Sequence, residues 1–296
     1  MIRMKFSIQL QYDVASTPSD FIFNIHAART RQQTVVHEQL MIEPEAVRAP
    51  VLYTDPMFGN RYVQMSAGLG QLRLRYDATV DIDHHFESPE RLDERPISQL
   101  PGEALSCLYP SRYCQSDRLR NFATREFGNL PPGYGRVKAI ADWVQQRVKF
   151  QIGSSNISTS AVDTLIEQTG VCRDFAHVMI ALCRAVNIPA RFATGIDYGA
   201  HPSLGPTDFH AYVEVFLGDR WYLFEPSGIS PPMGLVRIGT GRDAADVSFA
   251  TMFGAIKSYA PKVAIEAIED PDNGFSLPQL STQAISTHGE GLLLLA

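Results

Sequence analysis

The fold of this chain is decided by residues 169–189, TGVCRDFAHVMIALCRAVNIP. Apolar side chains recur in it at close to the 3.6-residue period of an α-helix. These side chains are Val171, Phe175, Val178, Met179, Leu182 and Val186. We expect Thr169–Gly170 to be a flexible lead-in and Cys172 to begin the helix. Asn187 and Pro189 predict its end, because Asn tolerates a left-handed cap and Pro cannot continue a helix.

Cys172 therefore lies at a helix N-terminus, among unpaired N–H groups and at the positive end of the helix dipole. Both favour the thiolate, which is the nucleophilic form of cysteine. Cys183 is on nearly the same face but roughly 16 Å further along the helix, at 1.5 Å per residue. Its neighbours are apolar, so we expect it in the core. Cys107 and Cys114 are also expected to be small buried side chains.

The composition is that of a globular protein with a substantial core. The chain has 296 residues, of which 45% are hydrophobic and 20% charged, so it can form two domains. A net charge of -6 argues against nucleic-acid and anionic-membrane partners. Four cysteines are too few for a disulfide framework. Neither a signal peptide nor the roughly 20 apolar residues of a membrane helix is recognisable, so we expect a cytoplasmic protein.

The first part of the chain predicts a β-rich domain. Two-residue alternation and turn residues predict antiparallel strands in a sandwich-like arrangement. The expected strands are 5–12, 21–25, 34–42, 61–65 and 72–82, with a turn at 53–60. A proline-containing connector follows at 87–110. We therefore divide the chain into an N-terminal β-rich domain with connector, 1–95, and a core domain with a C-terminal extension, 96–296.

The second part changes from helical to strand periodicity. Helices are expected at 117–127, capped by Ser116, at 136–148, and from the capping pattern Ser160–Asp163 to Thr169–Gly170. The helix of Cys172 comes next, and strands follow at 191–195, 210–217 and 220–225. Helices followed by strands within one unit predict an α+β fold. Residues after about 226 give no clear element pattern.

A nucleophilic cysteine needs a base, and the base needs a group that orients it. His210 begins a strand, and the turn Gly218–Asp219 returns the chain as a second strand. If Leu217 pairs with Arg220, His210 and Glu225 become diagonal neighbours on one face of this hairpin, within reach of each other. Glu214, two positions beyond Tyr212 on the same face, is the competing orienting group.

The other histidines are weaker candidates. His177 is about 140° around the helix from Cys172, so we expect it to point away and to be structural. His201 lies in a Gly- and Pro-containing loop. His84 and His85 lie beside aspartates, where a metal site is conceivable, but a solvated strand end is the better interpretation. No ligand spacing typical of zinc or calcium sites is present, so we predict no metal and no cofactor.

At these residues the chain resembles the transglutaminase-like superfamily, in particular a bacterial branch described as candidate cysteine proteases. The resemblance is carried by several short motifs along the chain. They are TDPMFGNRYV (54–63), YPSRYCQSD (109–117), STSAVDTL (158–165), TGVCRDFAHV (169–178), NIPARF (187–192), FHAYVEVF (209–216), WYLFEPSG (221–228) and GTGRDAADV (239–247). The resemblance implies a preceding β domain and a papain-like α+β core with a Cys–His–acid triad. It assigns Cys172 as nucleophile, His210 as general base and acid, and Glu225 as orienting group where many relatives have Asp.

The sequence thus predicts a thiol enzyme that acts on amide or peptide bonds through a thioester, most simply a cysteine peptidase or amidase. Its partner would be a peptide or protein substrate. Amine transfer onto glutamine uses the same catalytic residues and is the alternative activity. A non-catalytic binding protein on the same fold is the alternative of a different class. Weak candidates for substrate binding are Arg173, Asp174, Arg242 and Asp243. Oligomeric state is not predicted.

Overall fold

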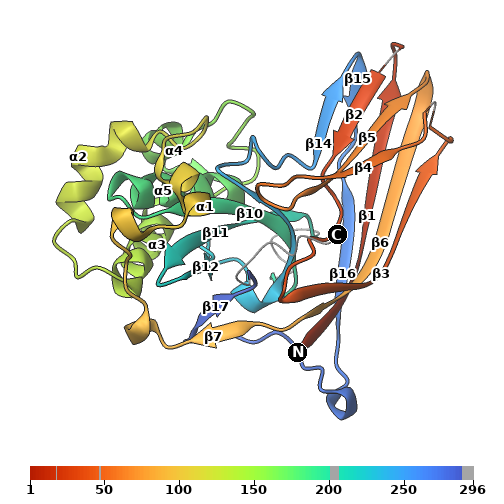
Figure 1. Cartoon of the computed structure of the whole chain (residues 1–296). Coiled ribbons are helices and arrows are strands. Elements are labelled where there is room, and N and C mark those ends of the chain that lie inside the picture. Colours follow the sequence, from red (N-terminus) through yellow and green to blue (C-terminus); the bar gives the residue numbers. More distant parts are fainter. Residues whose placement is uncertain (18, 47, 201–206, 289–296) are drawn as a thin grey trace.

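The computed structural model describes residues 1–17, 19–46, 48–200 and 207–288. His201 and the apolar residues 291–295 lie outside these ranges. A β-sandwich occupies one side of the molecule and a unit of helices and strands the other (Figure 1). The arrangement matches the expected order of a β domain followed by an α+β core.

The β-sandwich is built from two antiparallel sheets. Its strands from the N-terminal part are β1 (Ile2–Val14), β2 (Ser19–Phe23), β3 (Gln33–Glu43), β4 (Val51–Thr54), β5 (Arg61–Ala67) and β6 (Gly70–Ile82). One sheet has the order β15-β1-β6-β3, with β16 also paired to β1, and the other has the order β14-β2-β5-β4. Alternate side chains of β1 and β6 are buried between the sheets. The expected sandwich and its strands are confirmed, and β4 is an additional strand.

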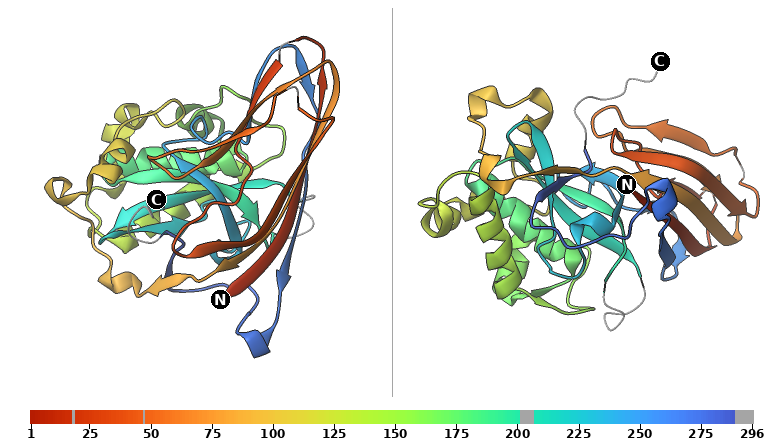
Figure 2. Two further views of the ribbon diagram at one scale, coloured as in Figure 1. Left: turned by 45° about the vertical axis from the view of Figure 1, so that its right-hand side comes forward. Right: turned by 90° about the horizontal axis from the view of Figure 1, so that it is seen from below.

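Three strands of this sandwich come from the far end of the chain. They are β14 (Ala250–Phe253), β15 (Ile256–Ser258) and β16 (Lys262–Ile268). β14 pairs with β2, while β15 and β16 both pair with β1. Figure 2 shows these late strands beside the first ones. Residues 250–268, which the sequence division counts with the second domain, thus lie in the sheets of the first.

A connector of short elements joins the two parts. It contains β7 (His85–Glu87), η1 (Pro89–Arg91), η2 (Ile97–Gln99), α1 (Gly102–Leu105) and η3 (Ser106–Leu108). β7 pairs with β17 (Ala284–Ser286), another late segment. His85 is thus held in a strand pair and is only half-buried. Outside the connector, two further 3₁₀ turns are η5 (Pro232–Gly234) and η6 (Pro271–Asn273).

Four helices precede the strands of the second unit. They are α2 (Ser116–Phe127), α3 (Tyr134–Arg147), α4 (Ala161–Glu167) and α5 (Cys172–Ala185). Ser160 caps α4 as expected, with its hydroxyl accepting from the Asp163 N–H. Ser116, expected as a cap, is the first residue of α2 instead. α5 is buried from Asp174 to Ala185, and Asn187 takes the left-handed conformation (φ 66°) that ends it.

Behind α5 lies a four-stranded antiparallel sheet. Its strands are β10 (Ala190–Asp197), β11 (Phe209–Leu217), β12 (Arg220–Phe224) and β13 (Leu235–Gly241), in the order β12-β11-β10-β13. Alternate residues of β11, from Ala211 to Leu217, share one core with α5. The α+β class is therefore confirmed. β13, which is buried throughout and does not alternate, is the strand that the sequence analysis did not place.

The free edge of this sheet meets the sandwich. Side-chain amides of the sandwich pair with the backbone of β13: Gln33 with both polar groups of Arg237, and Asn60 with both of Thr240. Ile196, Val236 and Ile238 extend into the core of the sandwich. The edge strand is thereby covered, which prevents further strand pairing there.

Among the helices within the described ranges, none is long and apolar enough to cross a membrane.

Candidate active site

Cys172 is the first residue of α5, as the helical period predicts. It is half-buried, whereas Cys107, Cys114 and Cys183 are completely buried, as expected for core residues. Burial raises the pKa of Cys114 to about 12. As the first helical residue, Cys172 has a backbone N–H with no intrahelical partner. Cys172 therefore combines access, a helix N-terminus and a spare N–H donor.

The segment leading to Cys172 is fixed, which corrects the expected flexible lead-in. Thr169–Gly170 forms β9, which pairs in parallel with β8 (Lys149–Phe150). The left-handed residue that ends α4 is Gln168 (φ 53°), one position before this strand. A Cβ on Gly170 would lie 2.8 Å from the Cβ of Asp174. Glycine at this position therefore lets the chain approach the first turn of α5 closely.

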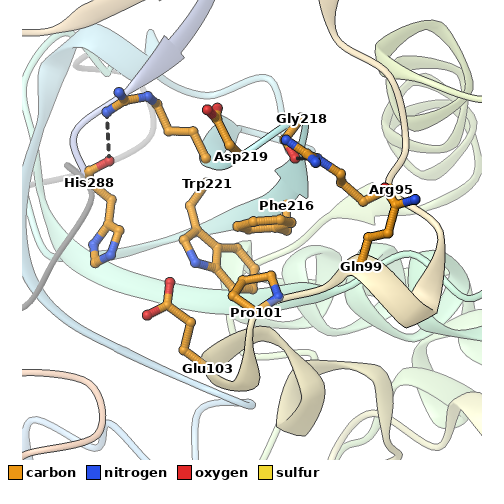
Figure 3. A pocket seen from close by; sticks show the side chains of 10 residues that line it. Arg95, Gln99, Pro101, Glu103, Phe216, Gly218, Asp219, Trp221 and His288 are labelled. Atoms are coloured by element: carbon orange, nitrogen blue, oxygen red, sulfur yellow. Dashed lines mark hydrogen bonds between the residues drawn. The ribbon is translucent and has the colours of Figure 1, made fainter.

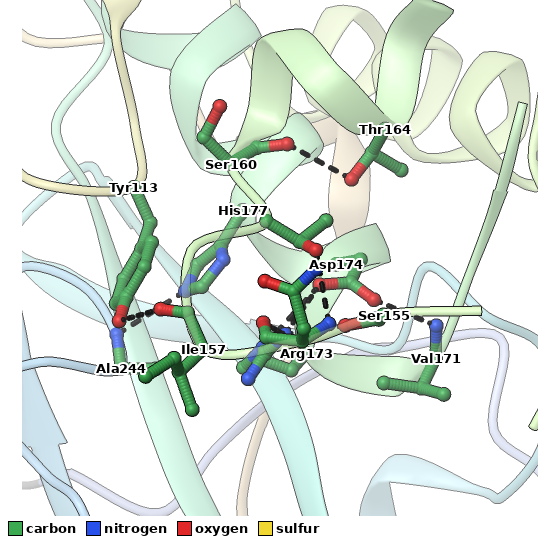
Figure 4. Close-up of polar contacts among 12 residues, drawn as sticks. Tyr113, Ser155, Ile157, Ser160, Thr164, Val171, Arg173, Asp174, His177 and Ala244 are labelled. Carbon is green, nitrogen blue, oxygen red and sulfur yellow. Dashed lines mark hydrogen bonds and ion pairs between the residues drawn. The ribbon is translucent and has the colours of Figure 1, made fainter. Parts of the chain in front are cut away.

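Asp174 and Arg173 stabilise the start of α5. The completely buried Asp174 carboxylate accepts a hydrogen bond of 2.9 Å from the Val171 N–H. Its other oxygen lies 3.1 Å from Arg173 Nη2, which also donates to Ser155 Oγ and, at 2.8 Å, to the carbonyl of Asn156. Figure 4 shows these contacts around the helix start. Arg173 and Asp174, two of the weak candidates for substrate binding, thus form a local ion pair at the helix start, and Arg173 also holds the segment of Ser155 and Asn156.

His210 lies on β11, and the hairpin has the predicted register. Leu217 pairs with Arg220 and Val213 with Phe224. Continuing this register places His210 and Glu225 on the same face, and His210 Nε2 lies 3.1 Å from Glu225 Oε1. His210 is 7% exposed, so water competes little for this contact. The diagonal His–carboxylate pair expected from the sequence is present in the structure.

His210 also interacts with Cys172. Burial lowers the pKa of His210, but the negative charge of Cys172, a hydrogen bond with Cys172 and a hydrogen bond with Glu225 together outweigh it. The result is a pKa well above the usual value of histidine. Cys172 and Glu225 are both neighbours of the His210 imidazole. The structure thus brings Cys172, His210 and Glu225 together.

Glu225 is held by the turn that follows β12. Its Oε1 accepts hydrogen bonds from the Ser227 hydroxyl and, at 3.2 Å, from the Ser227 N–H. Its Oε2 accepts from the Ile229 N–H at 2.8 Å. These donors fix the carboxylate against His210. A glutamate therefore fits at this position, although many relatives have the shorter aspartate.

Glu214, the competing orienting group, is engaged elsewhere. It is completely buried between two arginines, with Oε2 at 2.7 Å from Arg191 Nε and 3.0 Å from Arg237 Nη1. Burial alone would raise the pKa of Glu214, but the two guanidinium charges lower it to about 2. Glu214 therefore belongs to a buried ion cluster and Glu225 is the partner of His210.

His177 is structural, as predicted. It is completely buried, its ring stacks on Tyr113 at 5.0 Å, and its Nε2 accepts a hydrogen bond of 3.2 Å from the Ala244 N–H (Figure 4). Within the described part of the chain, its Nδ1 has no partner. Burial is the main cause of a pKa well below the usual value, so His177 is neutral.

Arg242 and Asp243, the remaining candidates, have structural partners. Arg242 forms an ion pair with Asp246 at 2.9 Å on the surface. The buried Asp243 carboxylate accepts from the N–H groups of Tyr113 and Ala245, each at 2.9 Å. Neither contacts Cys172, His210 or Glu225 through a hydrogen bond that the structure contains between described residues. Asp243 stabilises the neighbourhood of His177.

One residue near His210 was not singled out from the sequence. Asp197, the last residue of β10, is 5% exposed and contributes to the raised pKa of His210 after the larger effects of burial, Cys172 and Glu225. The only sequence signal that could have identified Asp197 is the pairing of β10 with β11. β10 and β11 can be recognised as neighbours, but which β10 residue lies opposite His210 depends on a loop whose length does not fix the register.

A pocket of about 320 Å³ lies away from this site, at the turn between β11 and β12 (Figure 3). Phe216 and Trp221 form its apolar wall, and charged side chains such as Arg95 and Glu103 surround it. The turn is seven residues along β11 from His210, which is about 23 Å at roughly 3.3 Å per residue.

Among the described residues, no group of three or more His, Cys, Asp or Glu side chains is arranged to hold a metal ion.

Comparison with known proteins gives a consistent assignment for both parts of the chain. Residues 120–226 match the Transglutaminase-like superfamily, and residues 2–103 match the family described as Bacterial transglutaminase, N-terminal domain. The crystal structure of a putative cysteine protease from Cytophaga hutchinsonii is that of a protein 38% identical to this chain. It superimposes with a TM-score of 0.87 over 96% of this chain and 97% of that chain.

The curated relatives are more distant. An uncharacterised protein of Mycobacterium leprae is 29% identical over 119 residues, which are 38% of this chain and 42% of that protein. An uncharacterised protein of Bacillus subtilis is 23% identical over 277 residues, which are 80% of this chain and 36% of that protein. The matches thus span less than half the length of these curated relatives.

Proposed function

Because the chain belongs to the transglutaminase-like superfamily, we propose that it is a thiol enzyme that hydrolyses amide or peptide bonds. Cys172 is the nucleophile, His210 the general base and acid, and Glu225 the group that orients His210. The observation that carries this proposal is the position of His210, which interacts with Cys172 on one side and lies 3.1 Å from Glu225 on the other. A thiol, a base and an orienting carboxylate are the parts required for nucleophilic catalysis.

In the first half of the reaction, the Cys172 thiolate attacks the carbonyl carbon of the amide and a C–S bond forms. The Cys172 N–H, at the start of α5, donates to the oxygen that becomes negatively charged. The His210 imidazolium then gives its proton to the amide nitrogen, the C–N bond breaks, and the amine leaves. The acyl group remains on Cys172 as a thioester.

In the second half, His210 takes a proton from water as the water oxygen attacks the thioester. The C–S bond breaks, the carboxylic acid leaves, and the thiolate–imidazolium pair is restored. If an amine takes the place of water, the same steps transfer the acyl group to that amine. Hydrolysis is therefore the proposed reaction and amine transfer the alternative that uses the same three residues.

The test of this proposal is the rate at which iodoacetamide alkylates Cys172 between pH 5 and pH 9, followed by mass spectrometry. A thiolate paired with imidazolium is alkylated well below pH 8, where an isolated thiol is largely protonated. We expect fast labelling at pH 6 in the wild type, and a rate that follows an ordinary thiol in His210→Ala. The matched control is His37→Ala, which removes an exposed histidine on β3.

Slow labelling that follows an ordinary thiol and does not change in His210→Ala would exclude the catalytic pair. The chain would then be a binding protein on this fold. If the pair is present, incubation of a peptide substrate with and without a fluorescent primary amine separates the two activities. Free acid as the main product supports hydrolysis, and incorporation of the amine supports transfer.

A further inference from the structure

Asp197 lies beside His210 on the side opposite to Glu225. In the pairing of β10 with β11, Gly195 is opposite His210 and Ile196 is opposite Phe209. Asp197 is two residues beyond Gly195, so it projects from the same face and is a diagonal neighbour of His210. His210 therefore has one carboxylate from the β12 side and another from the β10 side.

Asp197 differs from the other buried carboxylates because one of its oxygens has no partner. It is 5% exposed, and its Oδ2 is buried without a hydrogen bond to any residue of the described ranges. Glu225 has the Ser227 and Ile229 donors, and Glu214 has two arginines. A buried carboxylate oxygen without a partner is costly. A ligand that donates a hydrogen bond to this oxygen would therefore remove this cost and bind more tightly.

The local charge also favours a cationic ligand. In the thiolate–imidazolium form, the charges of Cys172 and His210 compensate each other, and those of Glu225 and Asp197 remain. Arg173, which follows Cys172 in the chain, already pairs with Asp174 and donates to the carbonyl oxygen of Asn156. Burial is the main cause of the raised pKa of Tyr212, and the charge of Asp197 is the next. The anionic field thus extends over the face that carries His210 and Tyr212.

The β-sheet geometry at this point is irregular in a way that suits a binding site. The register between β10 and β13 shifts between Thr194 and Gly195. A Cβ on Gly195 would lie 2.1 Å from the carbonyl oxygen of Val236, so the two strands approach closely there. The extra residue is Ile238 on β13, so β13 is the strand that bulges beside Gly195, and bulges are common next to active sites. Asp197 lies two residues from Gly195 on the neighbouring strand β10, opposite Leu235.

We propose that Asp197 forms a subsite, beside His210, for a positively charged group of the amide substrate, either an ammonium or a guanidinium. The enzyme then prefers amides that carry a basic residue next to the bond that is cleaved. The substrate class rests on the proposed thiol-enzyme function. The anionic subsite itself is a property of the surroundings of Cys172 and is measurable without any substrate.

The test uses three small thiol reagents that differ in charge. They are methyl methanethiosulfonate, which is neutral, its cationic 2-aminoethyl analogue and its anionic 2-sulfonatoethyl analogue. The Cys172 thiolate attacks the alkylthio sulfur of the reagent, a disulfide bond to that sulfur forms, and the S–S bond of the thiosulfonate breaks with release of methanesulfinate. Mass spectrometry gives the rate. The other three cysteines are completely buried, and Cys172→Ser supplies the blank.

In the wild type at low salt, we expect the cationic reagent to react about tenfold faster than the neutral one, relative to their rates with a free thiol. The anionic reagent should be slower than the neutral one. Asp197→Asn should reduce the cationic preference to about twofold, and Asp197→Glu should retain most of it. The matched control Asp117→Asn, which removes an exposed charge on α2, should leave it unchanged.

Three outcomes would overturn the proposal. One is a wild-type rate that does not depend on reagent charge. Another is a cationic preference that is the same in Asp197→Asn and Asp117→Asn. The third is an Asp197→Asn variant in which only the pH profile of the neutral reagent shifts, because Asp197 would then act on His210 and not on a ligand. If Asp197→Asn fails to fold, a wild-type rate that does not depend on reagent charge at low or high salt still overturns the proposal, and a cationic preference that Asp197→Glu retains supports it.

Paired peptide amides then test the substrate class. They carry either lysine or norleucine, of nearly equal length, next to the cleaved bond. A higher kcat/KM for lysine that falls in Asp197→Asn supports a basic substrate, and equal values for the two peptides overturn it. Because the reagents need no turnover, a charge-selective Cys172 without peptide cleavage would reject the proposed function and retain the subsite.

Discussion

Glu214 and Glu225 lie on the same face of one hairpin, but their neighbours give them different properties. Glu214 is enclosed by the guanidinium groups of Arg191 and Arg237. Among the described residues, Glu225 has N–H and O–H donors around it in addition to His210. The first glutamate therefore compensates buried positive charge, and the second is positioned to act on a histidine.

Substitution of the two glutamates by glutamine should separate these roles. Glu225→Gln removes the charge that favours imidazolium, so we expect kcat/KM to fall by about 100-fold and low-pH labelling of Cys172 to be lost. Glu214→Gln leaves two buried arginines uncompensated and should lower the free energy of unfolding by about 3–5 kcal/mol. Urea denaturation and alkylation against pH measure the two effects.

The two variants should differ in which property they lose, stability or low-pH alkylation. Glu225→Gln should unfold close to the wild-type urea concentration, and folded Glu214→Gln should retain alkylation at low pH. Glu225→Asp is the conservative control, since it keeps the charge and shortens the reach. The reverse pattern, with alkylation lost in Glu214→Gln and unchanged in Glu225→Gln, would make Glu214 the orienting group.

At the scale of residues, the sequence predicts contacts that are set by short turns. The two-residue turn Gly218–Asp219 fixes the register of the hairpin, so the pair of His210 and Glu225 follows from the sequence. The partners of Glu214 do not follow from it, because Arg191 and Arg237 come from β10 and β13. Asp197 was missed for the same reason, since its position beside His210 depends on the pairing of β10 with β11.

At the scale of elements, α5 depends on its first turn. The buried Asp174 carboxylate accepts from the Val171 N–H and pairs with Arg173. α4 has the same device, in which Asp163 Oδ2 accepts from the Ser160 N–H at 2.9 Å. The two caps differ in burial, because Asp174 is completely enclosed and Asp163 is near the surface.

Alanine in place of each aspartate should show what the buried cap does. Asp174→Ala leaves the Val171 N–H without its acceptor and Arg173 without its carboxylate, so we expect a loss of about 2–3 kcal/mol in the free energy of unfolding. We also expect slower alkylation of Cys172 at pH 6, because the helix start loses its fixed position. Urea denaturation and labelling measure both.

Asp163→Ala is the matched control. It should cost about 1 kcal/mol, as an exposed cap does, and leave the alkylation of Cys172 unchanged. Equal effects of both variants on alkylation would mean that the first turn of α5 does not position Cys172. Slower alkylation in Asp174→Ala without any change in stability would instead point to a direct effect of the Asp174 charge on the thiol.

Elements with clear periodicity were predicted, and those without it were not. α5 has a helical stripe and two stop residues, and β11 and β12 are joined by a tight turn. β13 is buried on both faces and ends in Gly239 and Gly241, so neither alternation nor turn chemistry marks it. Thr169–Gly170 has the composition of a loop, but its backbone pairs with β8, a contact that depends on tertiary structure.

At the scale of the whole molecule, the chain crosses between its two parts more than once. Residues 250–268 return to the sandwich, and residues 284–286 return to pair with β7. A single domain boundary at residue 95 does not describe this arrangement. Pairing between strands that are hundreds of residues apart has no local sequence pattern from which it could be predicted. The two parts are therefore expected to stabilise each other.

The molecule also encloses several histidines, His26 fully and His84 and His288 in part, which predicts a loss of stability in weak acid. Burial, with smaller contributions from nearby charges, lowers the pKa of His26 and of His84 to about 4 and that of His288 to about 3. The unfolded chain takes up these protons near pH 6.5, before the folded chain does, so stability falls from pH 6.5 to about 4. His210 has the opposite sign, since its raised pKa gives stability that is lost as the pH rises through that value.

Urea denaturation at pH 7.5, 6.5, 5.5 and 4.5 tests this. Fluorescence of Trp143 and Trp221 reports on the α+β unit, and circular dichroism also reports on the sandwich. We expect the midpoint to fall steadily below pH 6.5, with His26 alone contributing about 3 kcal/mol by pH 4. His26→Phe keeps a ring against Tyr76 and should flatten the acid slope, whereas the exposed His37→Ala should not. A midpoint that is constant from pH 7.5 to 4.5, or an equal slope in His26→Phe and wild type, would show that these histidines are not held neutral by the fold.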